Sequence, residues 1–104
     1  MLIMDRQNAV APGWSHVLST TNDVAELEAF RIRVGAPAAA LQLRNRRRPH
    51  LDLKLEPRRL ALASPEVRVF ARTSDMIRYL RSLALVALAT SLPAPSSQLL
   101  APSS

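Results

Sequence analysis

Apolar residues recur at helical spacing over residues 24–34. They follow one another at steps of three or four, and they are Val24, Leu27, Phe30 and Val34. This period is typical of a helix with one face in the core. Asp23 and Glu26 form a capping box at its start, and Gly35 supplies the left-handed residue that ends many helices. We therefore expect a helix that begins after Asp23 and ends at Gly35.

Other segments alternate as strands do. Leu51, Leu53 and Leu55 are separated by polar residues, which directs one face to the core and the other to solvent. Apolar residues also favour strands over 14–18, 60–63 and 67–70, with residues 56–59 as the turn into 60–63. Residues 37–43 fit a helix or a strand, and we favour a strand over 41–44. These strands predict an antiparallel sheet.

A second helix is predicted after the strands, capped by Thr73 or Ser74. Its core-facing positions are Ile77, Leu80, Ala84 and Leu88, with Met76, Leu83 and Ala87 one step round. Beyond Leu85 the helix is apolar on every side. Such a helix cannot face water, so we expect this end to be buried in the domain or against a second copy of the chain. The expected interface residues are Leu83, Leu85, Val86 and Leu88.

These elements fit one small domain. A chain of 104 residues is too short to divide its core between two domains. The predicted fold class is α+β, a small antiparallel sheet of three to five strands packed by two helices on one face. Residues 1–13 have no sustained period and are expected to be a loosely held leader. Residues 14–91 are the expected domain, and residues 92–104, rich in Pro and Ser, the expected disordered tail.

Composition removes several classes of protein. The chain has no cysteine, which excludes disulfides, thiolate nucleophiles and zinc sites that need sulfur, and its 2 glycines provide no glycine-rich phosphate loop. The longest apolar stretch, residues 83–89, is far shorter than the ~20 residues that cross a bilayer, and no secretory signal pattern is present. We expect a cytoplasmic protein that uses no cofactor and does not enter a membrane.

The charge of the chain favours acidic partners. The formal net charge is +6, and 13 of the 14 basic residues are arginine, whose planar fork can hold a phosphate with two hydrogen bonds. Four arginines crowd the predicted loop at residues 44–48, and two more follow in the next predicted turn. The candidate nucleic-acid-binding residues are Arg44, Arg46, Arg47, Arg48, Arg58 and Arg59. The same run of arginines would also arise in an ordinary solvated turn, because the codon usage of a GC-rich genome favours arginine.

No catalytic constellation can be identified along the sequence. His16 and His50 are 34 residues apart, without an acidic neighbour at metal-ligand spacing. We predict no catalytic residue, no metal site and no enzymatic activity. One alternative stays open, because Arg48, His50 and Tyr79 are residue types with which a metal-free ribonuclease could position and protonate a phosphate.

Two functions fit these features. The first is a small basic nucleic-acid-binding or regulatory protein whose Arg-rich loop contacts the phosphate backbone non-specifically. The alternative is a protein-interaction module, such as an adaptor, an inhibitor or an antitoxin-like partner. It would form a homodimer through the apolar end of its C-terminal helix and offer its arginines to an acidic protein. A third hypothesis, a chain with no evolved role, predicts a partly molten state.

Overall fold

The structure, a computed structural model, describes residues 1–8, 10–44 and 48–91. Its elements are β1 (Leu2–Gln7), β2 (Trp14–Ser19), α1 (Val24–Val34), the 3₁₀ turn η1 (Ala38–Ala40), β3 (Leu41–Gln42), β4 (His50–Lys54), α2 (Leu55–Ala63), β5 (Val67–Arg72) and α3 (Thr73–Ser91). One five-stranded sheet with helices packed on it confirms the predicted α+β class. No helix within the described ranges is long and apolar enough to cross a membrane.

The five strands form a mixed sheet in the order β3-β4-β2-β1-β5. Neighbouring strands are antiparallel except β1 and β5, which run parallel. The prediction of a purely antiparallel sheet is therefore wrong at one edge, because residues 60–63 are not a strand. They belong to α2, which connects β4 to β5 as a crossover between two strands of the same direction.

The local reason for α2 lies in the residues that start it. Leu55 has a φ of 55°, in the left-handed region, and its side chain is exposed instead of being the third core position of β4. Pro57 lies in the first turn, where a backbone N–H has no partner within the helix and proline costs little. Ala61, four residues later, is buried. The alternation of β4 therefore ends at Leu53.

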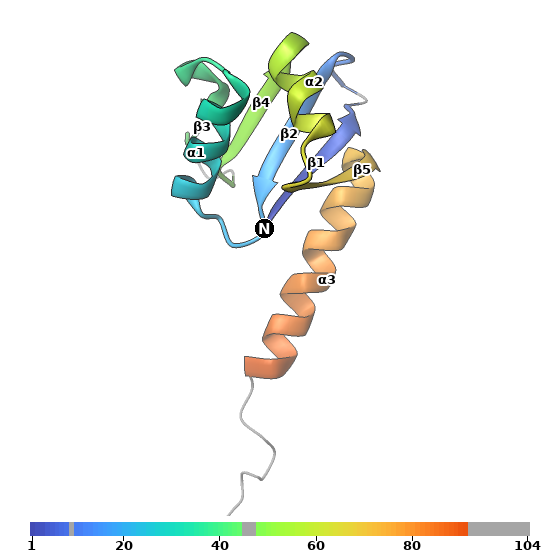
Figure 1. Ribbon diagram of the computed structural model, residues 1–104. Coiled ribbons are helices and arrows are strands. Elements are labelled where there is room, and N and C mark those ends of the chain that lie inside the picture. Colours follow the sequence, from blue (N-terminus) through green and yellow to red (C-terminus); the bar gives the residue numbers. More distant parts are fainter. Residues whose placement is uncertain (9, 45–47, 92–104) are drawn as a thin grey trace, which may run out of the picture.

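Helices cover both faces of the sheet. α1 and α2 pack on one face, over a buried cluster that includes Phe30 and Leu53. α3 packs on the opposite face, where Met76 joins Ile3 and Leu18 in a second cluster. Figure 1 shows α3 leaving the end of β5 and extending beyond the sheet. The two helices that share a face are thus α1 and α2, whereas the predicted C-terminal helix lies on the other face.

α1 follows its prediction closely. The Asp23 carboxylate accepts a hydrogen bond from the Glu26 N–H at 3.1 Å, and Gly35, with a φ of 75°, ends the helix. Its buried positions are Leu27, Phe30 and Val34, whereas Val24 in the first turn is exposed. The predicted strand over 14–18 is confirmed as β2, and that over 41–44 shortens to the two residues of β3. The predicted tail at 92–104 lies outside the described residues.

The N-terminal residues form a central strand, so the prediction of a loosely held leader is wrong. β1 lies between β2 and β5, and Leu2, Ile3, Met4 and Asp5 are each at most 2% exposed. A strand covered on both faces needs apolar residues at consecutive positions rather than in alternation. The opening residues meet that need, and a search for periodicity overlooks them.

Ile3→Ala should lower the free energy of unfolding by about 2–5 kcal/mol, because it opens a cavity between the sheet and α3. Val10→Ala, at a position of the same segment that is 93% exposed, should change it by less than about 0.5 kcal/mol. Urea unfolding followed by circular dichroism measures both values. Equally small effects would show that the N-terminal segment does not contribute to the core.

Candidate functional site

Strand register brings four ionisable side chains to one face of the sheet. His16 of β2 is paired with Asp52 of β4, and Leu18 is paired with His50. Paired residues of neighbouring strands point to the same face, so both histidines lie on the face that α3 partly covers. Asp5 of β1 reaches the same place from the other side of β2, since its carboxylate contacts His16. Three strands thus bring together side chains that lie far apart in the sequence.

Asp5 is fully buried, at 0% exposure, and holds the imidazole of His16. One carboxylate oxygen accepts a hydrogen bond from the His16 backbone N–H at 2.6 Å, and the other lies 3.0 Å from Nδ1 of the ring. The hydroxyl of Thr73, at the start of α3, donates to that second oxygen. Because a carboxylate accepts, Nδ1 of His16 carries a proton, and Nε2 on the other side of the ring faces the Asn8 amide and the Asp52 carboxylate.

These donors decide the charge of Asp5. Burial of the side chain opposes ionisation, but hydrogen bonds from the His16 ring, the Thr73 hydroxyl and the His16 backbone outweigh it. The pKa of Asp5 is consequently lowered from its ordinary value. The site therefore contains a permanent negative charge at neutral pH, bound to a ring that can accept a second proton.

His50 is also held through Nδ1, but by a backbone carbonyl instead of a carboxylate. Its Nδ1 donates to the backbone carbonyl of Arg48 at 2.9 Å, and its Nε2 lies 3.4 Å from an oxygen of Asp52. The same oxygen is 3.9 Å from Nε2 of His16. The two imidazole rings meet edge to face, with centroids 5.6 Å apart. Each ring nitrogen of His50 thus faces an oxygen atom.

Two cavities adjoin at Thr73, and we call them together the histidine groove. The smaller cavity, of about 180 Å³, contains the two histidines, and the larger, of about 630 Å³, continues past Asn8 to Arg72. The lining residues of both are Gln7, Asn8, Pro12, His16, Leu18, Arg48, His50, Arg72, Thr73, Ser74, Met76 and Ile77.

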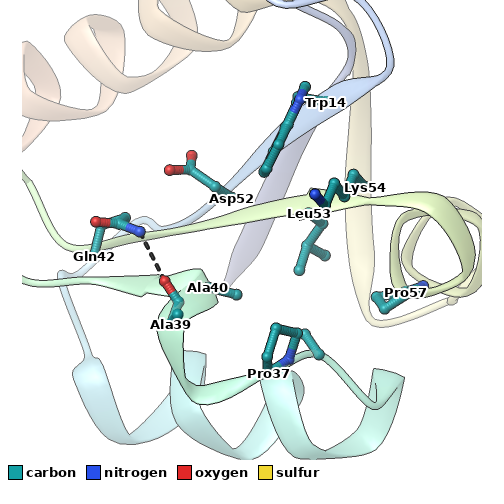
Figure 2. A pocket seen from close by; sticks show the side chains of 10 residues that line it. Trp14, Pro37, Ala39, Ala40, Gln42, Asp52, Leu53, Lys54 and Pro57 are labelled. Atoms are coloured by element: carbon teal, nitrogen blue, oxygen red, sulfur yellow. Dashed lines mark hydrogen bonds between the residues drawn. The ribbon is translucent and has the colours of Figure 1, made fainter.

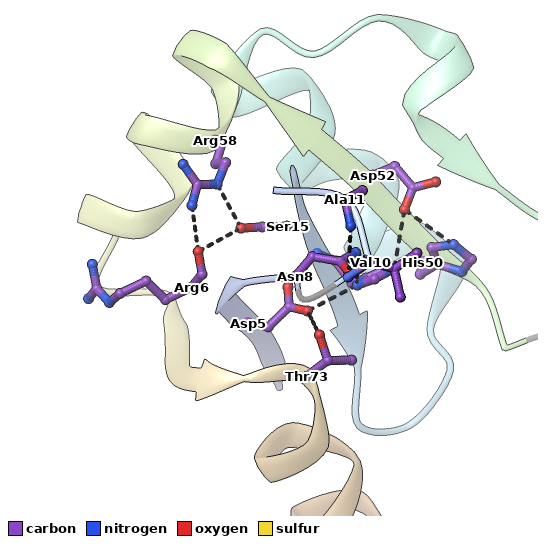
Figure 3. A network of polar contacts seen from close by, with 11 residues as sticks. Asp5, Arg6, Asn8, Val10, Ala11, Ser15, His50, Asp52, Arg58 and Thr73 are labelled. Carbon is purple, nitrogen blue, oxygen red and sulfur yellow. Dashed lines mark hydrogen bonds and ion pairs between the residues drawn. The ribbon is translucent and has the colours of Figure 1, made fainter. Parts of the chain in front are cut away.

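Asn8 closes the polar network beside His16. Its Oδ1 accepts hydrogen bonds from the backbone N–H groups of Val10, at 2.9 Å, and Ala11, at 3.2 Å. This orientation directs Nδ2 to the His16 ring, 3.4 Å from each ring nitrogen. Figure 3 shows Asn8, Asp5 and Thr73 in this network. The Asn8 amide thus binds the backbone that follows β1 and also lines the groove.

Another cavity, of about 280 Å³, lies where β4 meets the 3₁₀ turn and α2 (Figure 2). Its lining is mostly apolar, and the ammonium of Lys54 lies 4.8 Å from the ring centroid of Trp14. Lys54 and Asp52 are the charged residues among those that line it. This cavity therefore offers apolar contact and lacks the paired acid–base groups of the histidine groove.

The predicted nucleic-acid-binding residues separate into three groups. Arg58 donates to the hydroxyl of Ser15 at 2.9 Å and to the Arg6 carbonyl, as Figure 3 shows, so it connects α2 to the sheet. Arg59 is paired with Glu56 within α2. Arg44 and Arg48 are exposed, and Arg48 lines the groove. The remaining predicted residues, Arg46 and Arg47, lie outside the described residues.

The predicted dimer interface is exposed over most of its length. Leu85, Val86 and Leu88 are 67%, 60% and 59% exposed, and Leu83 is partly buried. The end of α3 is therefore not buried in the domain.

The sequence prediction missed most of the histidine groove. Asp5 and Thr73 were assigned to a leader and a cap, and His16 and Asp52 become neighbours only through strand register. Tyr79, named with Arg48 and His50 in the ribonuclease alternative, packs on Phe70 and lines neither cavity of the groove. Over the described ranges, no group of three or more His, Cys, Asp or Glu residues is arranged to hold a metal ion.

Comparison with known proteins gives no relative for this chain: no family model, no curated protein and no solved structure matches it. The function is therefore inferred from the residues of the groove and their geometry.

Asp5→Asn should lower the free energy of unfolding by about 1.5–3 kcal/mol near neutral pH, because a buried site loses hydrogen bonds to a charged acceptor. The native pKa of Asp5 is lowered. The carboxylate therefore stabilises the fold above the unfolded-state pKa of about 3.9, and this contribution disappears as the pH falls through the native pKa. Urea unfolding across this range should show the difference between wild type and Asp5→Asn shrinking below about pH 4.

A matched control is Glu66→Gln, which removes a carboxylate from an exposed pair with Arg33. Its effect on the free energy of unfolding should stay within about 1 kcal/mol at every pH. A stability difference for Asp5→Asn that is unchanged down to about pH 3 would contradict the role assigned to the carboxylate.

Proposed function

We propose that the protein binds the phosphate backbone of nucleic acids in the histidine groove, without reading sequence. One observation carries this proposal. Arg48 lines the smaller cavity of the groove and Arg72 the larger, and neither has an acidic partner among the residues that the structure describes. Two such arginines beside a pair of imidazoles form a place where phosphates are favoured.

The start of α3 adds to this preference. Thr73 and Ser74 form the first turn of a 19-residue helix and line the groove. Backbone N–H groups in the first turn of a helix have no partner within the helix and carry partial positive charge. An anion in the groove would therefore meet the helix terminus as well as the two arginines. The formal net charge of +6 favours its approach.

The engaged arginines support a local rather than a diffuse binding surface. Arg31 is paired with Glu28 within α1, and Arg59 with Glu56 within α2. Arg33 of α1 is paired with Glu66, which lies between α2 and β5. All three arginines thus belong to helices that cover the other face of the sheet from the groove. The predicted phosphate clamp therefore moves from the Arg-rich run as a whole to Arg48 and its neighbours in the groove.

Arg48→Ala combined with Arg72→Ala should weaken binding to single-stranded RNA and DNA, irrespective of sequence. The magnitude of the slope of log K against log salt should fall by about 1.4, since each of the two lost phosphate contacts contributes about 0.7 for single strands. Fluorescence titrations at about 50 and 200 mM salt measure this slope. Arg33→Ala combined with Arg59→Ala removes the same charge away from the groove and should leave the slope nearly unchanged. Equal effects of the two double variants would contradict groove binding.

A second candidate function, homodimerisation through α3, is favoured by the exposed stripe of Leu85, Val86 and Leu88. No charged residue follows Arg81 in the described helix, so the stripe offers no charge for a polar partner to match. The same stripe on a second copy provides the apolar surface that it lacks, in a symmetric pair.

Leu85→Glu combined with Leu88→Glu should convert the dimer to a monomer, because two charges would be buried in an apolar contact. Size-exclusion chromatography with light scattering measures the mass at concentrations around 1–100 μM, a range suited to moderate affinity. Ile32→Glu, at an exposed apolar position of α1, should leave the mass unchanged. A monomeric wild type throughout this range would contradict the second function.

A further inference from the structure

The histidine groove contains two imidazoles in different hydrogen-bonding environments, and phosphate binding alone gives no reason for that difference. We infer that the groove cleaves RNA by acid–base catalysis, with His16 as the base and His50 as the acid. This inference rests on the proposed function, because the scissile phosphate must first bind in the groove, beside the two histidines and Arg48. The inference adds a reaction and a substrate class to the proposed function.

His16 has the features of a base. Its Nδ1 proton is held by the buried Asp5 carboxylate at 3.0 Å, so a proton taken from a substrate arrives at Nε2. The negative charge of Asp5 then stabilises the positive ring that results. His16 is partly exposed and lines the smaller cavity, so a substrate can reach it.

His50 has the features of an acid. The Arg48 carbonyl accepts a hydrogen bond from Nδ1 at 2.9 Å, and the Asp52 carboxylate lies 3.4 Å from Nε2. Two oxygen acceptors stabilise a ring that carries both protons and can give one up. The ring centroids of His16 and His50 are 5.6 Å apart, so both rings can contact one phosphodiester.

The nucleophile is best supplied by the substrate. The hydroxyl of Thr73 donates to Asp5, so its proton is already engaged in the fold. RNA carries its own nucleophile, the ribose 2′-hydroxyl, next to each phosphate. The remaining requirement is to move one proton away from that hydroxyl and another onto the leaving oxygen, which are the two steps that a base and an acid perform.

The reaction balances without a further reactant. His16 Nε2 takes the proton of the 2′-hydroxyl while O2′ forms a bond to phosphorus, and the P–O5′ bond breaks as His50 gives a proton to O5′. The products are a 2′,3′-cyclic phosphate and a 5′-hydroxyl. His16 is left protonated and His50 deprotonated, and exchange with water restores both. Arg48 faces the charge that develops on the phosphate oxygens.

Asp5 is a positioning residue in this scheme, since it acts through His16. Asp5→Asn keeps the side-chain shape but removes the charge that stabilises protonated His16. Cleavage should therefore fall, and the limb of the pH profile that reports the base should move to lower pH than in wild type, because the protonated ring has lost its stabilising charge. A substitution that only loosened the fold would lower the rate without moving that limb.

The test uses the full chain with a single-stranded RNA oligonucleotide carrying a 5′ fluorophore, and with its 2′-deoxy analogue as a binding probe. The expected result is cleavage of the RNA, with 2′,3′-cyclic phosphate ends, in the presence of EDTA, and binding without cleavage of the analogue. His16→Ala and His50→Ala should each lower the cleavage rate about 10²–10⁴-fold. His50→Gln tests the same role with a smaller change of shape, and Arg33→Ala, purified identically, should keep the wild-type rate.

The outcomes separate this inference from the proposed function. Binding of the analogue without cleavage of the RNA overturns the inference and leaves phosphate binding in place. Failure to bind either oligonucleotide at about 50 mM salt overturns both. Cleavage that survives His16→Ala, or that needs an added divalent cation, overturns the assignment of the two histidines. Loss of cleavage in His50→Gln with an unchanged circular dichroism spectrum supports it.

Discussion

The buried carboxylate of Asp5 connects three parts of the fold. It belongs to the central strand β1, accepts from both the backbone and the ring of His16 on β2, and accepts from the Thr73 hydroxyl at the start of α3. A buried charge is costly unless donors surround it. The strand, its neighbour and the helix must therefore take these relative positions for the charge to be satisfied, and the position of α3 on the sheet follows from that requirement.

The same interaction orients side chains of the groove. Asp5 fixes which nitrogen of His16 carries the proton, and the Arg48 carbonyl does the same for His50. Both rings are thus oriented before any ligand arrives, by groups that belong to the fold itself. Preorganised groups of this kind need little rearrangement when charge develops on a substrate. Hydrogen bonds offset the energetic cost of burying Asp5, and one of them also orients the His16 ring.

The sequence predicts the parts of this fold that depend on local patterns. α1 was predicted because its period, its cap at Asp23 and its terminal Gly35 act within the helix. β1 was missed because consecutive apolar residues carry no period. α2 was missed because the alternation of apolar and polar residues in β4 continues into Leu55, the first residue of the helix. The site was missed for a different reason. The pairing of His16 with Asp52 depends on the register of strands 36 residues apart, which no local pattern records.

The two candidate functions would use different parts of α3. Its first turn lines the groove, whereas Leu85 lies 12 residues further along, which is about 18 Å at 1.5 Å per residue. A symmetric contact at the far end would leave the groove open.

Burial of the apolar stripe in such a contact would also stabilise the helix as a whole, since isolated helical turns are marginal in water. Because the Thr73 contact to Asp5 depends on the same helix, a second copy would then stabilise the groove from a distance. The two proposed functions would for that reason be coupled through α3, rather than compete for it.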